Sequence, residues 1–177
     1  MKPIRFCLTL SACAVLLVAA FSYAQTPVNA GTGPVPSAIL AAKNIFVSNG
    51  GSDSGLFPEP FSGDPSRPYT QLYAALKATG AYTLVGDPSQ ADLVLEVRLT
   101  APYGPSNPNK QNGTSDPLPM FRLVVYDRKS HYVLWTVTQS VEWALLQKTH
   151  NRNFDDALNL LLNDFLSLSG KPAAAAH

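Results

Sequence analysis

The chain has 177 residues, enough for one domain once an N-terminal targeting segment is set aside. Its net charge is +1, and removal of Lys2 and Arg5 leaves 11 basic against 12 acidic side chains. No basic run occurs, which excludes nucleic-acid binding through phosphates. Both cysteines, Cys7 and Cys13, lie in the targeting segment, so the rest of the chain has no disulfide, catalytic thiolate or cysteine-bound zinc.

Residues 1–24 are typical of a secretory signal peptide. Two basic residues precede an uncharged, mostly apolar run of 16 residues, and small residues at positions 22 and 24 predict cleavage between Ala24 and Gln25. Two alternatives stay open. The run could remain as an anchor, although a spanning helix needs about 20 residues, or the sequence Leu-Ser-Ala-Cys could direct lipidation at Cys13. We expect an exported, periplasmic protein whose mature chain has no transmembrane segment.

Residues 25–42 are rich in proline and glycine, and this composition predicts a flexible lead. One domain is expected over residues 43–170, followed by a disordered tail over residues 171–177. The short apolar run from Asn44 to Ser48 predicts the first strand. The long Gly-, Pro- and Ser-rich loop that follows matches neither a nucleophile elbow nor a phosphate-binding loop.

The first helix is predicted to begin at Pro68, which suits a first turn, and to end at Gly80, which favours the left-handed terminator. An apolar stripe at helical spacing is expected to face the core; it consists of Tyr69, Leu72, Tyr73 and Leu76. A second strand is predicted over residues 81–86.

The stretch "DPSQADLVLEVRLT" holds three carboxylates, and their positions indicate structural roles. Asp87 precedes a proline and is predicted to cap a single turn. Asp92 lies where a strand begins. Strict alternation then places Glu96 and Arg98 on the wetter face, where they could pair, opposite a buried row of Leu93, Leu95, Val97 and Leu99. A catalytic pair would need a cleft and a perturbed environment.

Residues 101–119 form a second long loop, either a hairpin tip or a binding loop, and Tyr103 is its only aromatic residue. Two apolar runs then flank "DRKSH", which predicts a long antiparallel hairpin with a turn at Asp127. Trp135 and Trp143 share one strand parity. Trp135 is expected in the core, whereas Trp143 lies near the strand end, where it either covers the rim of the core or is exposed.

The last helix is predicted to begin at Asn153, with Asp156 three residues on as a capping-box variant, and to end at Gly170. The elements thus follow the order β-α-β-β-β-β-α. Five strands and two amphipathic helices predict an α+β fold, a two-layer sandwich in which a mostly antiparallel five-stranded sheet carries both helices on one face.

Three segments carry a resemblance to known proteins: "ALKATGAYTLVGDPSQADLVLEV", "LVVYDRKSHYVLWTVTQSVE" and "NFDDALNLLLNDF". Over Leu72 to Leu168 the chain resembles bacterial cell-envelope proteins of unknown function, of the domain-of-unknown-function 4136 type. The shared features are a helix ending in Gly, a proline-containing approach to a strand that begins Ala-Asp-Leu, a hairpin with Leu-Trp and a terminal helix. The resemblance implies no catalytic residue. The chain departs from it in its long proline-rich loop.

Chemical motifs are sparse. His131, His150 and His177 lack metal-ligand spacing, and no metal or cofactor is expected. His150 is interpreted as a polar loop residue just before the last helix. A serine–histidine–aspartate set stays open, because its members assemble from distant positions.

Two functions are compatible with these sequence features. The first is an exported, non-enzymatic binding or assembly module for another envelope protein or an envelope polymer, with a binding patch formed by Trp143, Tyr103, Phe57 and Phe61. The second is an exported hydrolase with a site near His150 or near Asp92 and Glu96. Convergence of these three residues to within about 3 Å around one cleft would favour the hydrolase.

Overall fold

A computed structural model describes residues 33–106 and 115–173. The chain divides into residues 1–32 and a second unit from Gly33 onward, to which all described residues belong. The predicted signal peptide, the Ala24–Gln25 cleavage site, Cys13 and His177 lie outside the described residues. Residues 33–42 were assigned to the predicted lead, yet they contain helix α1 (Ser37–Ala41), and Ile39 is fully buried in the core.

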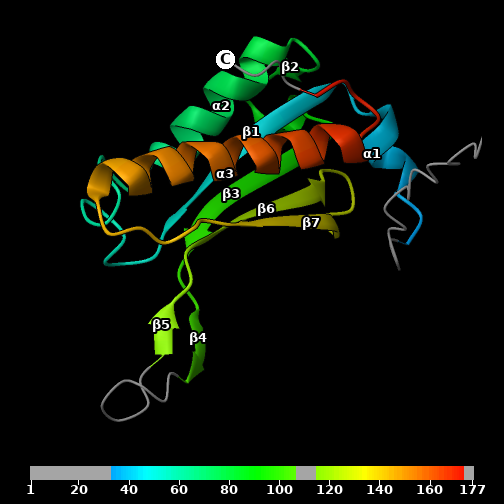
Figure 1. Ribbon diagram of the computed structural model, residues 1–177. Coiled ribbons are helices and arrows are strands. Elements are labelled where there is room, and N and C mark those ends of the chain that lie inside the picture. Colours follow the sequence, from blue (N-terminus) through cyan, green and yellow to red (C-terminus); the bar gives the residue numbers. More distant parts are fainter. Residues whose placement is uncertain (1–32, 107–114, 174–177) are drawn as a thin grey trace, which may run out of the picture. The chain divides into compact units, whose positions relative to one another are not determined.

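A five-stranded sheet in the order β2-β1-β3-β6-β7 forms one layer (Figure 1). Its strands are β1 (Asn44–Ser52), β2 (Thr83–Leu84), β3 (Leu93–Thr100), β6 (Met120–Asp127) and β7 (Val133–Ser140). β1 is parallel to both β2 and β3, whereas β3–β6 and β6–β7 are antiparallel. The sheet is therefore mixed, which corrects the predicted mostly antiparallel pairing. The physical reason is that helix α2 (Arg67–Thr79) returns the chain to the end at which β1 began.

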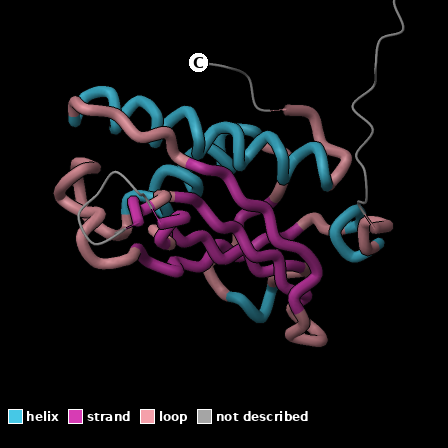
Figure 2. The backbone as a smooth tube through the Cα atoms, turned by 60° about the horizontal axis from the view of Figure 1, so that its bottom comes forward, coloured by secondary structure: helices cyan, strands magenta, loops and turns pink. Residues whose placement is uncertain are grey.

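Helices α2 and α3 (Gln147–Leu168) lie on the same side of the strands (Figure 2). The predicted two-layer α+β fold is confirmed. The sheet face toward the helices consists of buried apolar side chains: Ile45, Val47, Leu93, Leu95, Val97, Leu99, Phe121, Leu123 and Val125. The alternation predicted for β3 accounts for this face, because successive side chains point to opposite sides of a strand.

Two local predictions are confirmed. Gly80 ends α2 with φ +63°, in the left-handed region that a side chain disfavours. Asp87 caps the short 3-10 helix η1 (Pro88–Gln90), where its carboxylate accepts the Ser89 N–H at 2.8 Å. Short-range chemistry decides both features, so they were readable from the sequence.

The start of the last helix was predicted wrongly. α3 begins at Gln147, and Asn153 lies inside it, where its side-chain amide donates to the Glu142 carbonyl at 3.0 Å. His150 is consequently a helical residue that is only 4% exposed, not a polar loop residue. The helix extends toward its N-terminus because His150 and Phe154 both fall on the face that packs against the core.

The predicted loop of residues 101–119 contains a two-stranded sheet. β4 (Tyr103–Ser106) pairs antiparallel with β5 (Ser115–Pro117), and an N–H of Leu118 donates to the Pro102 carbonyl at 2.9 Å near the base of this ribbon (Figure 1). Residues 107–114 between these strands lie outside the described residues, so the choice between a hairpin tip and a binding loop stays a prediction.

Candidate functional site

The sheet face away from the helices carries polar side chains on its central strands. Glu96 lies opposite Val124 of β6, and Arg98 lies opposite Arg122. Arg98 forms an ion pair at 2.8 Å with Asp53, which follows β1, so the suggested pairing of Glu96 with Arg98 is not the one formed. Asp53 was not among the predicted site residues, because a loop residue gives no periodic signal of its partner.

Asp53 joins the end of β1 to the end of β3. One carboxylate oxygen accepts from Arg98, and the other accepts the Ala101 N–H at 3.0 Å. The hydrogen bond from the Ala101 N–H, followed by that from the Arg98 side chain, lowers the pKa of Asp53. A charged carboxylate beside a guanidinium is thus held at the surface.

A groove of about 720 Å³ opens beside this ion pair. It is lined by the Asp53–Arg98 pair, three prolines (Pro60, Pro117 and Pro119) and two aromatic side chains, Tyr103 and Trp143. Tyr103 is 82% exposed and Trp143 is 61% exposed. We call it the Tyr103–Trp143 groove; it combines apolar walls with a few fixed polar groups, as ligand sites commonly do.

The core supports Trp143 from below. Its ring meets the buried His150 ring edge-on, with 4.6 Å between centroids, and His150 in turn contacts Phe61 at 5.7 Å. Phe61 is fully buried and Phe57 is partly buried against the core. The structure therefore brings Tyr103 and Trp143 together at one groove, places Phe61 inside the domain and leaves Phe57 partly buried against the core. Loop composition did not reveal that this loop folds back onto α3.

The three candidates for a hydrolase do not converge. The Asp92 carboxylate accepts the backbone N–H groups of Lys43 and Asn44, both at 2.9 Å, and these bonds lower its pKa. Glu96 is on the sheet face away from the helices, whereas His150 is on α3, across the sheet. Asp92 ties β1 to β3, and no common cleft joins it to the other two.

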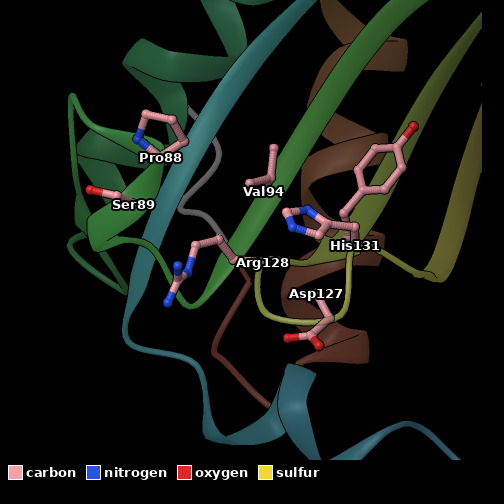
Figure 3. A pocket seen from close by; sticks show the side chains of 7 residues that line it. Pro88, Ser89, Val94, Asp127, Arg128 and His131 are labelled. Carbon is pink, nitrogen blue, oxygen red and sulfur yellow. The ribbon is translucent and has the colours of Figure 1, made fainter.

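A second hollow, of about 470 Å³, lies beside the turn between β6 and β7 (Figure 3). Ser89, His131 and Asp127 line it, which are the residue types of a hydrolytic triad. Figure 3 shows the Ser89 side chain pointing away from His131. Hydrogen bonds from Ser89 to Asp87 lower the pKa of Asp87, and Asp127 accepts from the Ser130 N–H at 2.9 Å. Acyl transfer requires a nucleophile in contact with its base, and Ser89 and His131 do not form such a pair.

The described residues contain neither a metal-binding cluster nor a membrane-spanning helix. In residues 33–106 and 115–173, no three His, Asp or Glu side chains gather closely enough to hold a metal ion. No helix in those ranges is long and apolar enough to cross a bilayer.

No protein-family model matches the chain, and no curated protein is similar to it. Solved structures do match. A DUF4136 family protein from Bacteroides thetaiotaomicron is 15% identical, with a TM-score of 0.47 over 75% of this chain and 92% of that chain. A PelC dodecamer from Paraburkholderia phytofirmans is 15% identical, with a TM-score of 0.42 over 80% of this chain and 95% of that chain.

The C-terminal domain of LpoB from Escherichia coli is also similar, at 15% identity and a TM-score of 0.39 over 64% of this chain and 88% of that chain. A protein of the type that the sequence resembles is thus among the solved structures that match. The predicted resemblance is confirmed as a resemblance of structure, and it assigns no site residue to this chain.

Proposed function

We propose that the protein is an exported, non-enzymatic binding module of the bacterial cell envelope, and that the Tyr103–Trp143 groove binds an envelope polymer of the polysaccharide class. The observation that carries the proposal is the meeting of two exposed aromatic rings with an ion pair in one groove. Sugar rings present apolar C–H faces that stack on aromatic rings. Their hydroxyl groups need the donors and acceptors that Arg98 and Asp53 supply.

The rigidity of the groove also supports binding. Trp143 rests on His150, and Asp53 is held by two hydrogen bonds, so neither side chain must be ordered when a ligand arrives. Side chains that are fixed before binding lose less conformational entropy on association. The three prolines restrict the backbone of the groove wall in the same way.

The hydrolase alternative has no geometric support, because Asp92, Glu96 and His150 lie apart and Asp92 is engaged by backbone N–H groups. Export itself rests on the predicted signal peptide. Mass spectrometry of the mature protein from an expressing bacterium should give a chain that begins at Gln25. A lipid-modified Cys13 would replace the soluble periplasmic location with a membrane-anchored one.

The test of the groove is co-sedimentation of the mature protein with purified cell-envelope polysaccharides, together with a pull-down from envelope extract. Tyr103→Ala and Trp143→Ala should each reduce polysaccharide retention about tenfold, the loss expected for an anchor residue worth above 1 kcal/mol. Tyr132→Ala is the matched control, because Tyr132 is 74% exposed and does not line the groove. Thermal unfolding of each variant checks that the fold persists.

If both groove variants retain the polysaccharide as well as the wild-type protein does, the groove is not the binding site. Recovery of a protein partner instead of polysaccharide, lost in the same two variants, would keep the groove and change its ligand to an envelope protein.

A further inference from the structure

β7 forms one outer edge of the five-stranded sheet. Its inner side pairs with β6 from Met120↔Ser140 to Tyr126↔Val133, and no other strand of the described residues pairs with its outer side. An edge strand presents a row of unpaired backbone N–H and C=O groups at the spacing of a neighbouring strand. Only another extended peptide satisfies such a row group by group.

β7 has few of the features that usually protect an edge. Its sequence from Val133 to Ser140 is VLWTVTQS, with no charged residue and no proline over eight residues. One register shift interrupts it, near Val133. The opposite edge strand, β2, has only two residues and offers little to pair with. Proteins commonly shorten, charge or bend their edges against unwanted pairing, and β7 is uncharged and long in comparison.

A shallow hollow of about 200 Å³ runs between the end of β7 and helix α3. Gln139 and Ser140 line it from the strand, and Asn153, Asp156 and Leu160 line it from the helix. Leu160 is 50% exposed there. A strand added to β7 would place every second side chain over this flank of α3, where Leu160 would receive an apolar one.

The flank carries more acidic than basic side chains. Glu142 and Asp156 line the hollow, and Asp164 follows Leu160 by four residues on the same side of the helix, whereas the one cation on that row beside them, Arg152, precedes Asp156 by four residues. None of these three carboxylates forms an ion pair with another described residue. A second copy of this chain paired with β7 would bring the same excess of carboxylates against this flank. The charges therefore disfavour self-pairing and favour a basic partner.

We propose that β7 is a docking edge for an extended segment of another protein that carries lysine or arginine at alternate positions. The segment adds a sixth strand to the sheet, with its backbone on β7 and its basic side chains toward Asp156 and Asp164. This mode, strand addition with alternate side chains read by flanking pockets, takes its affinity from main-chain hydrogen bonds and its selectivity from the flank. The edge is distinct from the Tyr103–Trp143 groove, so either can fail alone.

The test uses a synthetic ten-residue peptide with the sequence Lys-Thr-Val-Thr-Lys-Thr-Val-Thr-Lys-Thr. The matched peptide has glutamate in place of each lysine. Hydrogen exchange of the mature protein should show added protection of the β7 amides with the lysine peptide only. Asp156→Lys and Asp164→Lys should each weaken binding at least fivefold. Glu59→Lys, an equal change of charge on an exposed loop residue, should leave the affinity unchanged.

Absence of β7 protection by the lysine peptide overturns the proposal, as does equal binding of the two peptides. Sedimentation velocity provides a second measurement. The wild-type chain could associate with itself, and Thr138→Lys, which adds a charge to β7, could abolish that association. This result would assign the edge to a second copy and overturn the proposal of a basic partner.

Discussion

Replacing Phe154 with alanine is expected to reduce the free energy of unfolding by about 4 kcal/mol. Phe154 is fully buried on α3, at the centre of an aromatic cluster. Ring centroids of Phe121, Phe61 and Phe57 lie 4.8, 5.4 and 6.2 Å from its own. The Arg67 guanidinium covers the ring at 4.1 Å from its centroid. This cluster joins the sheet, α3 and the long loop that supports the Tyr103–Trp143 groove.

The magnitude has two parts. Burial of a phenylalanine side chain contributes roughly 1.5–3 kcal/mol. Its removal leaves a void of roughly 100 Å³ before relaxation, and at about 24 cal/mol per Å³ that void adds up to about 2 kcal/mol.

Urea unfolding followed by tryptophan fluorescence measures the change. Leu160→Ala is the matched control, since it shortens a side chain of the same helix that is 50% exposed, and its expected cost is below about 1 kcal/mol. The slope of the unfolding free energy against urea should stay the same in both variants. A Phe154→Ala cost no larger than that of Leu160→Ala would refute the view that this cluster holds α3 to the sheet.

Two further expectations concern the junction of β1 and β3. Backbone N–H groups lower the pKa of Asp92 from its ordinary value of 3.8. The charged carboxylate therefore stabilises the fold at pH values above 3.8, and this contribution is lost as the pH falls through the lowered pKa. Asp92→Asn should therefore reduce the melting temperature at neutral pH, by an amount that shrinks as the pH falls below 3.8; a difference that stays constant into that range contradicts this role. A Cβ added at Gly50 would lie 2.8 Å from the Val97 carbonyl oxygen, so Gly50→Ala should cost about 1–3 kcal/mol in urea unfolding. Gly86→Ala, with no heavy atom within 4 Å of its added Cβ, should change stability by less than about 0.5 kcal/mol, and equal costs for the two glycines would contradict the close approach of the strands.

Two predictions that depend on neighbours in the sequence succeeded. Alternation placed Leu93 and Leu95 in the core, and Gly80 ended its helix. The start of α3 shows the limit. Asn153 had the chemistry of a helix cap, but burial of His150 and Phe154 against the sheet outweighed a capping preference of about 1 kcal/mol.

The residues of the candidate site also divide into those that the sequence predicted and those that only the structure revealed. Exposure of Trp143 was one of two readings left open by its position near a strand end, and the structure places it 61% exposed over His150. Asp53 and Phe61 lie in one Gly- and Pro-rich loop, where no periodicity separates a surface carboxylate from a core ring. Only the path of that loop decides that one meets Arg98 and the other meets Phe154.

The amino-acid sequence alone determined the five strands of the main sheet, the two amphipathic helices, the α+β class and the structural role of Asp87, because backbone preference and hydrophobic period act over a few residues. Tertiary structure alone decided the parallel pairing of β1 with β3, the meeting of Tyr103 with Trp143 and the unpaired edge of β7 beside α3. Those features join segments far apart in the chain, and their free energy comes from contacts that exist only once the sheet has formed.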